Sequence, residues 1–100
     1  MKTKSKPKNE VCIWALWGCP ECIRLKHIFW VHQIPFRLEN VKPILEGDIQ
    51  QMLAKGYDTA VLRAVTAVLL DNDMRPPVVQ DGDVFLSYSE ALERYGVSDA

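Results

Sequence analysis

The strongest constraint on the fold lies near the start of the chain, where an apolar run is followed by a glycine and then a proline. Val11–Trp17 is short and rich in β-branched and aromatic residues, which is typical of a buried strand. Gly18 permits a tight turn, and Pro20 suits the first position of a helix because no amide hydrogen is needed there. This stretch therefore predicts a strand, a turn and a helix in direct succession.

Two cysteines occupy this junction. Cys19 is expected at the helix N-terminus, where unpaired amides and the helix dipole stabilise a thiolate. Cys22 follows three residues later on the same helix face and can close a disulfide with Cys19. We predict that this pair performs thiol–disulfide exchange. Cys12 lies inside the apolar run and is predicted to be a small buried side chain.

Length and composition indicate one small soluble domain. The chain has 100 residues, of which 48% are hydrophobic and 25% charged. The net charge of −1 gives no argument for a nucleic-acid or membrane partner. We expect a disordered basic tail over residues 1–10, one domain over 11–97 and a short tail over 98–100.

The apolar segments are too short for membrane insertion or export. No stretch approaches the roughly 20 apolar residues that a transmembrane helix needs. The run Val11–Trp17 is also shorter than the apolar region of a secretory signal, and the fold needs it as a strand. We therefore expect a cytoplasmic protein, and we expect it to be a monomer.

The remaining chain alternates helical and extended patterns. A helix is predicted over residues 20–32, with Ile23, Leu25, Ile28 and Phe29 inward, and a parallel strand over 36–41. Residues 42–73 are predicted to be helical, with an amphipathic segment over 44–53 and a second over 60–70. The predicted elements that follow are a hairpin turning at Asp81-Gly82 and a last helix that starts within residues 87–90 and stops at Gly96.

With this order, residues 11–96 resemble the glutaredoxin branch of the thioredoxin superfamily. Three segments carry the resemblance: Cys19-Pro20-Glu21-Cys22 with the four residues after it, residues 76–79, and residues 88–90. The resemblance implies an α/β, thioredoxin-like (glutaredoxin-type) β-α-β-α-β-β-α fold of three layers around a mixed four-stranded sheet. It also implies a cis-proline before the third strand, opposite the cysteines.

The spacing to the Asp-Gly turn favours Pro76 as that proline, so that the Arg75–Pro76 bond would be cis, and Pro77 is the alternative. The Arg75 backbone would then be available to pair with an extended substrate. The resemblance further implies that Cys19 attacks a substrate disulfide and that Cys22 resolves the mixed disulfide. The implied site residues, besides the two cysteines, are an active-site loop of Trp17, Gly18, Pro20 and Glu21 and a substrate-binding set of Arg75, Pro76, Pro77, Ser89 and Glu90.

The implied partners are a disulfide-containing protein or a small thiol substrate, and a reductant. Two departures from the family bear on the chemistry. Glu21 stands where an aromatic residue is common, and its carboxylate predicts a less stabilised thiolate and a more reducing couple, unless it simply points into solvent. Leu86-Ser87 replaces a common Gly-Gly pair and is expected to crowd glutathione. Glutathione and a thioredoxin-reductase-like protein both stay open as reductants, and no other cofactor is expected.

Two other functions are compatible with the motif. The chain could be a non-catalytic thioredoxin-fold binding module in which the cysteines sense redox state. Zinc sites also use the Cys-x-x-Cys spacing, but no second such pair completes four ligands, so no metal is expected. Trp14 and Trp30 are predicted to be core or partly buried, and Trp17 is either part of the substrate surface or a packing residue.

Overall fold

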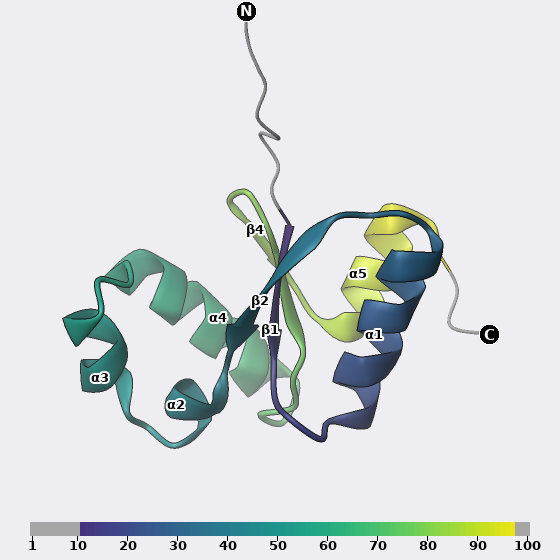
Figure 1. Cartoon of the computed structure of the whole chain (residues 1–100). Coiled ribbons are helices and arrows are strands. Elements are labelled where there is room, and N and C mark those ends of the chain that lie inside the picture. Colours follow the sequence, from purple (N-terminus) through teal and green to yellow (C-terminus); the bar gives the residue numbers. More distant parts are fainter. Residues whose placement is uncertain (1–10, 98–100) are drawn as a thin grey trace, which may run out of the picture.

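The computed structural model describes residues 11–97, so the tails expected over 1–10 and 98–100 lie outside the described residues. Within that range the chain alternates strands and helices, as expected for an α/β protein (Figure 1). The elements are β1 (Val11–Ala15), α1 (Pro20–Val31), β2 (Phe36–Asn40), α2 (Lys42–Leu45), α3 (Ile49–Ala54), α4 (Thr59–Asp71), β3 (Val78–Asp81), β4 (Val84–Leu86) and α5 (Tyr88–Tyr95).

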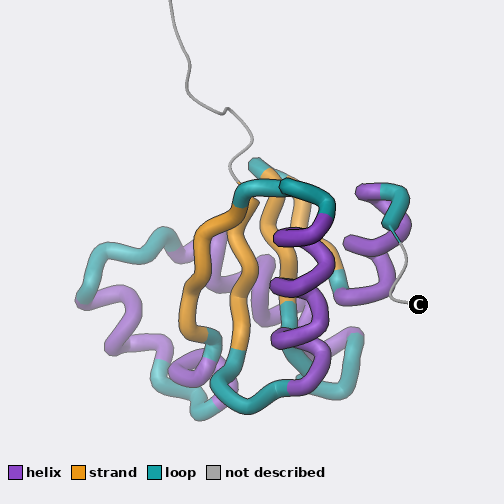
Figure 2. The backbone as a smooth tube through the Cα atoms, turned by 45° about the vertical axis from the view of Figure 1, so that its right-hand side comes forward, coloured by secondary structure: helices purple, strands orange, loops and turns teal. Residues whose placement is uncertain are grey.

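The four strands form one mixed sheet in the order β2-β1-β3-β4. The strands β1 and β2 are parallel, whereas β1 with β3 and β3 with β4 are antiparallel. Helices α1 and α5 cover one face, and α2, α3 and α4 cover the other (Figures 1 and 2). The predictions of a parallel β-α-β unit and of a mixed four-stranded sheet are therefore confirmed.

Alternation along β1 sends successive side chains to opposite faces of the sheet. The α1-side core consists of Val11, Ile13, Leu25, Ile28, Phe29, Val79 and Ala91. The α4-side core consists of Cys12, Trp14, Val41, Ile44, Met52, Leu62, Val65, Leu69 and Val78. The predicted burial of Cys12 and Trp14 is confirmed, because their side chains are 1% and 2% exposed.

Helix α1 matches the predicted 20–32 helix to within one residue. Leu25, Ile28 and Phe29 are buried, as expected. The inward placement of Ile23 is wrong, because Cys22 and Leu25 occupy the buried stripe and Ile23 is turned away from it, 56% exposed. The burial predicted for Trp30 is also wrong, since this side chain is 72% exposed on the outer face.

The region 42–54 differs from the single amphipathic segment that the sequence predicts. It folds as two short helices, α2 and α3. Gly47 lies between them at φ +75°, a left-handed conformation that ends α2 and that glycine adopts readily. The second predicted helix and the hairpin are confirmed as α4 and β3–β4, and α5 begins at Tyr88 behind the N-cap Ser87.

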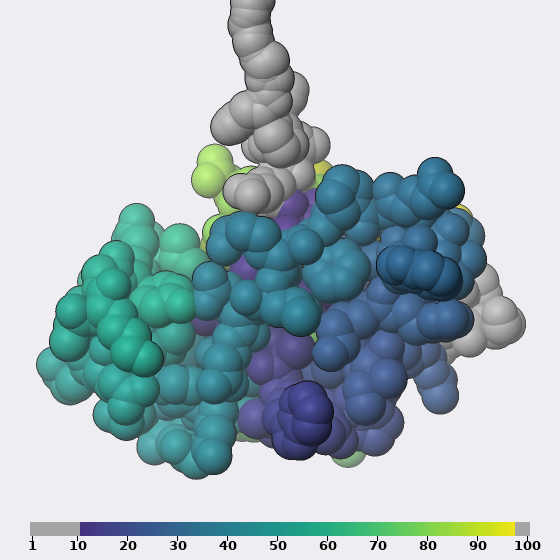
Figure 3. Space-filling view, in the orientation of Figure 1, coloured from purple at the N-terminus to yellow at the C-terminus, as the bar shows by residue number. Residues whose placement is uncertain are grey.

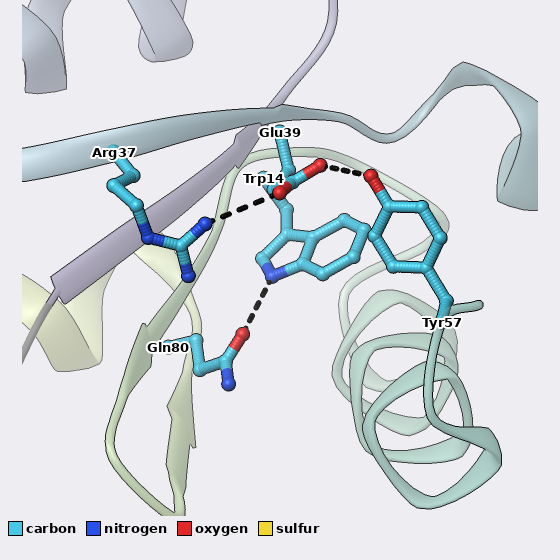
Figure 4. A network of polar contacts seen from close by, with 5 residues as sticks. All are labelled: Trp14, Arg37, Glu39, Tyr57 and Gln80. Atoms are coloured by element: carbon cyan, nitrogen blue, oxygen red, sulfur yellow. Dashed lines mark hydrogen bonds and ion pairs between the residues drawn. The ribbon is translucent and has the colours of Figure 1, made fainter. Parts of the chain in front are cut away.

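A polar network ties the sheet to the connection between α3 and α4 (Figure 4). The Trp14 indole N–H donates to Gln80 Oε1 at 3.0 Å, which links β1 to β3. The Tyr57 hydroxyl donates to Glu39 on β2, and Arg37 Nη1 lies 3.3 Å from the same carboxylate. The hydrogen bond to Glu39, followed by burial, raises the pKa of Tyr57 above its usual 10.0.

No helix within residues 11–97 combines the length and the apolar character needed to cross a membrane.

Candidate functional site

The two cysteines of the predicted motif lie where β1 ends and α1 begins. Cys19 is the N-cap of α1, and its sulfur accepts the backbone N–H of Cys22 at 3.1 Å. The Cys19 N–H donates to the Leu16 carbonyl at 3.2 Å and closes the turn. Gly18 occupies that turn at φ +84°, a left-handed conformation that suits glycine. The strand, turn and helix predicted from the sequence thus place one sulfur at a helix N-terminus.

The two sulfurs have different environments. Cys19 is partly exposed, whereas the Cys22 side chain is 1% exposed, and no disulfide joins them. Burial, followed by the hydrogen bond with Cys19, raises the pKa of Cys22 to about 12, although the Leu16 amide, 3.5 Å from its sulfur, acts in the opposite direction. At neutral pH Cys22 is therefore a protonated thiol, and Cys19 is the sulfur that a solvent-borne molecule can reach.

The segment before β3 lies against Cys19. The Cys19 thiol donates to the Pro76 carbonyl at 3.6 Å, across 57 residues of sequence. The prediction that the Arg75–Pro76 bond is cis is wrong, because the cis bond joins Pro76 to Pro77. Pro77, the alternative, is buried and directly precedes Val78, the first residue of β3. The cis-proline therefore lies one residue later than its spacing to the Asp-Gly turn indicated.

A cavity of about 360 Å³ opens beside the Cys19 sulfur, and we call it the thiol cavity. Its walls come from the end of β1, the first turn of α1 and the segment before β3, and its lining is mainly apolar. The lining residues are Leu16, Cys19, Pro20, Glu21, Arg75 and Pro76. Of the predicted site residues, the structure therefore brings five together here, while Pro77 packs behind them.

A second cavity, of about 250 Å³, adjoins the first, and we call it the polar cavity. Glu21 and Arg75 line both cavities, so the two are neighbours. The lining residues are Glu21, Asp71, Asn72, Asp73, Arg75, Tyr88 and Ser89. The predicted residue Ser89 thus belongs to the site.

Glu90, which the sequence also placed in the site, lines neither cavity. Its carboxylate accepts the Ser87 N–H at 2.9 Å, and its own N–H donates to Ser87 Oγ at 3.3 Å. This capping box explains why Glu90 stands at the start of α5. Leu86 packs against the α1-side core and lines neither cavity.

Trp17 projects from the turn between β1 and α1 and is 96% exposed. Figure 3 shows this dark purple stretch of chain standing out from the surface. Trp17 borders a different cavity, of about 550 Å³, which it shares with Leu16, Leu38 and Lys42 among others. Leu16 lines both this cavity and the thiol cavity, so Trp17 lies near the thiol cavity without lining it.

Sequence reasoning missed Leu16 and the residues that follow α4. Leu16 ends the apolar run and lines the thiol cavity, and its amide contacts Cys22. Asp71, the last residue of α4, and Asp73 were given no role in the site by the sequence, yet they line the polar cavity. No local pattern distinguishes these aspartates from an ordinary loop, since only the pairing of β3 with β1 brings their connection to the end of the sheet where α1 begins.

Among residues 11–97, no group of three or more His, Cys, Asp or Glu side chains is arranged to hold a metal ion. His27, the histidine nearest in sequence to the cysteines, stacks on Trp30 with ring centroids 6.3 Å apart. This histidine is exposed on the outer face of α1, whereas Cys22 is buried.

Comparisons with models of protein families, with curated proteins and with solved structures found no match. What the site can do is therefore inferred from its own geometry. That geometry combines a reachable sulfur at a helix N-terminus, a buried and protonated second sulfur, and a cavity large enough for part of a substrate.

Proposed function

We propose that the chain is a glutaredoxin-like thiol–disulfide oxidoreductase with a thioredoxin-like fold, in which Cys19 is the nucleophile and Cys22 the resolving thiol. One observation carries the proposal: the Cys22 N–H donates to the Cys19 sulfur at 3.1 Å while only Cys19 is open to solvent. An amide donor at a helix N-terminus favours negative charge on that sulfur. The order of elements and the strand order β2-β1-β3-β4 support the fold assignment.

In the first step the Cys19 thiolate attacks one sulfur of a substrate disulfide. A new S–S bond joins Cys19 to that sulfur while the substrate S–S bond breaks, and the other substrate sulfur leaves as a thiolate that takes a proton from water. The thiol cavity would hold the bound half of the substrate, because Leu16, Pro20 and Pro76 provide apolar contact around the sulfur.

In the second step Cys22 loses its proton and attacks the Cys19 sulfur. The Cys19–Cys22 bond forms, the bound half of the substrate leaves as a thiol, and the substrate has gained two electrons and two protons. The raised pKa of Cys22 keeps this thiol protonated at neutral pH in the reduced chain. Glutathione or a thioredoxin-reductase-like protein would then supply the electrons that restore the dithiol.

A single-turnover reaction tests the proposal. The fully reduced chain is mixed with bis(2-hydroxyethyl) disulfide, and the released thiol is counted. The natural chain should release two thiols per protein, whereas Cys22→Ser should stop after one and retain a mixed disulfide visible by mass spectrometry. Cys19→Ser should react at least about a hundredfold more slowly, because the accessible nucleophile is gone.

Cys12→Ala is the matched control, because this cysteine lies in the α4-side core and takes no part in the steps above. Its thiol release should equal that of the natural chain. A Cys19→Ser variant that reacts as fast as the natural chain would refute the assignment. A natural chain that forms the internal disulfide once but is not reduced again by glutathione or by a reductase would favour the redox-sensing binding module instead.

A further inference from the structure

We propose that this site selects disulfides by their charge, reacting faster with neutral and cationic disulfides than with anionic ones such as oxidised glutathione, and that Glu21 is the principal specificity residue. The inference rests on the proposed function and deepens it by naming the substrate class. Glu21 lines both the thiol cavity and the polar cavity, so it lies beside any substrate group that extends from one into the other.

A substrate is expected in the thiol cavity because the sulfur of Cys19, the proposed nucleophile, can be reached from solvent. Cys19 is the partly exposed member of the pair, and the thiol cavity is the recess beside its sulfur. A disulfide that approaches Cys19 from this side places one of its two substituents in this recess, next to the neighbouring polar cavity. The charges along these walls then act on the substrate before any bond changes.

The walls carry more negative than positive charge. Three carboxylates, those of Glu21, Asp71 and Asp73, line the two cavities together with one guanidinium, that of Arg75. All four side chains are exposed, so their effect is that of charges in a largely aqueous setting. One such charge about 7 Å from a substrate charge changes a rate or affinity by roughly threefold at low ionic strength.

The two aspartates have a defined place because the turn after α4 is hydrogen-bonded. The Asn72 side chain donates to the Val68 carbonyl at 2.8 Å, and the Arg75 N–H donates to the Asn72 carbonyl at 3.0 Å. These bonds fix the chain that carries Asp71 and Asp73 at the wall of the polar cavity.

The nearest lysines lie on the other side of Leu16. Lys26 and Lys42 line the cavity that borders Trp17, and neither lines the thiol cavity or the polar cavity. Lys42 is also 3.9 Å from the Glu46 carboxylate. The positive charges of these two lysines therefore do not neutralise the carboxylates that lie on the Glu21 side of Cys19.

The test compares three disulfides of different charge in the single-turnover reaction: cationic cystamine, neutral bis(2-hydroxyethyl) disulfide and anionic oxidised glutathione. Each rate is divided by the rate of dithiothreitol with the same disulfide, which removes the intrinsic differences in sulfur reactivity. At low salt the corrected rates should fall in the order cationic, neutral, anionic, with about a tenfold span. Half-molar salt should shrink that span severalfold.

Two variants that each remove one negative charge distinguish a local effect of Glu21 from an effect of the overall charge. Glu21→Gln should shrink the ratio of the cationic to the anionic rate by about threefold. Asp83→Asn removes a charge from the exposed β3–β4 turn, at the opposite end of the sheet from the start of α1, and should leave that ratio unchanged (Figure 1).

Corrected rates for oxidised glutathione that equal or exceed those for the neutral disulfide would overturn the inference while leaving the proposed function intact. A ratio that responds to Asp83→Asn as strongly as to Glu21→Gln would overturn the role of Glu21. A chain that does not react even with the neutral disulfide would instead remove the proposed function, and the inference would fall with it.

Discussion

The two sides of the sheet are built in different ways. On the α1 side, both helices begin at local signals, Cys19-Pro20 for α1 and the Ser87–Glu90 capping box for α5. On the α4 side, two of the three helices are short, and contacts between residues distant in sequence hold the layer to the sheet. Trp14 and Tyr57, for example, have ring centroids 5.9 Å apart. Cys19 and Cys22 thus lie on the side whose geometry the local sequence determines.

The α4 side nevertheless completes the site. The connection from α4 to β3 carries Asp71, Asp73, Arg75 and Pro76 to the end of the sheet where α1 begins (Figure 1). The proposed nucleophile therefore comes from one layer, and about half of the residues that line the cavities beside it come from the segment that leaves the other. This division makes a clear expectation: changes on the α1 side alter reactivity, whereas changes on the α4 side alter the surroundings of the sulfur and the stability of the fold.

The largest expected effect concerns the reactivity of three thiols toward iodoacetamide. Cys19 should react at neutral pH, while Cys22 on the same side and Cys12 on the other, each 1% exposed, should not. A Cys22 pKa of about 12 instead of the usual 9.0 lowers its thiolate fraction at neutral pH by about a thousandfold. Mass spectrometry of digests taken over time would measure the three rates.

The pH dependence of the reaction at Cys22 tests the burial of this thiol. Because the pKa of Cys22 is raised in the folded chain, its thiolate appears only as the pH approaches about 12. The unfolded chain loses this proton near 9.0, so folding stability falls as the pH rises between these values. Rapid alkylation of Cys22 at pH 8 in the folded chain would contradict the described burial.

The next effect compares one core leucine from each side. Leu25 and Leu69 are both 0% exposed, in the α1-side core and the α4-side core respectively. Each leucine-to-alanine change should lower the free energy of unfolding by about 2–5 kcal/mol. Urea denaturation followed by circular dichroism would measure both losses.

Two probes can show whether the sides unfold together. Tryptophan fluorescence reports in part on Trp14 in the α4-side core, and circular dichroism reports on all the helices. The two transitions should coincide in the natural chain and in both variants, since β1 and β3 contribute to both cores. An earlier fluorescence transition in Leu69→Ala alone would show that the α4 side is a separate cooperative unit.

The same contrast explains how much of the fold could be predicted. The segment 11–31 was predictable because strand pattern, turn glycine, helix-starting proline and helical periodicity agree with one another. The hairpin was predictable because Asp81-Gly82 is a strong turn signal, and Gly82 has φ +62°. Neither prediction needed information about contacts between distant parts of the chain.

Failures occurred where such contacts decide the outcome. Residues 42–54 carry one apolar stripe, but the left-handed conformation of Gly47 ends α2 and divides them into two helices. The thiol pair was found from its spacing, whereas two of the three carboxylates of the polar cavity, those of Asp71 and Asp73, lie 49 and 51 residues beyond Cys22. Helical periodicity alone also could not show that Trp30 faces solvent.

A smaller effect compares one tyrosine hydroxyl from each side. Tyr95 donates to Asp81 at 2.7 Å on the α1 side, and Tyr57 donates to Glu39 on the α4 side. Each tyrosine-to-phenylalanine change retains the ring and removes the hydrogen bond to a carboxylate, which should cost about 1.5–3 kcal/mol of stability. Urea denaturation at pH 7 would measure both values.

Alkaline titration checks the cause of these losses. Burial, followed by the hydrogen bond to Asp81, raises the pKa of Tyr95, and the hydrogen bond to Glu39 raises that of Tyr57. The stability that each hydrogen bond contributes is therefore fully present below pH 10.0, the usual pKa of tyrosine. It is lost as the pH rises through the raised pKa of that tyrosine in the folded chain. Each phenylalanine variant should show a shallower loss of stability above that pH, and an unchanged slope would contradict the assigned partner.

The smallest effect compares the side-chain caps of α5 and α4. Ser87 Oγ accepts the Glu90 N–H at 3.3 Å at the start of α5, and Asp58 accepts the Ala60 N–H at 2.8 Å at the start of α4. Replacing either residue by alanine should lower stability by about 0.5–2 kcal/mol. Ser87→Ala should lie at the upper end, because Ser87 is 8% exposed and water cannot replace its hydroxyl, whereas Asp58 is exposed.

The same two variants also test whether the layers contribute differently to the site. Ser89 lines the polar cavity and lies in the first turn of α5, so fraying of that turn in Ser87→Ala should change the rate with charged disulfides. The start of α4 lines none of the cavities next to Cys19, so Asp58→Ala should leave those rates unchanged. Equal changes in rate for equal losses of stability would mean that the site responds to overall stability, and the contrast between the two sides would then not extend to function.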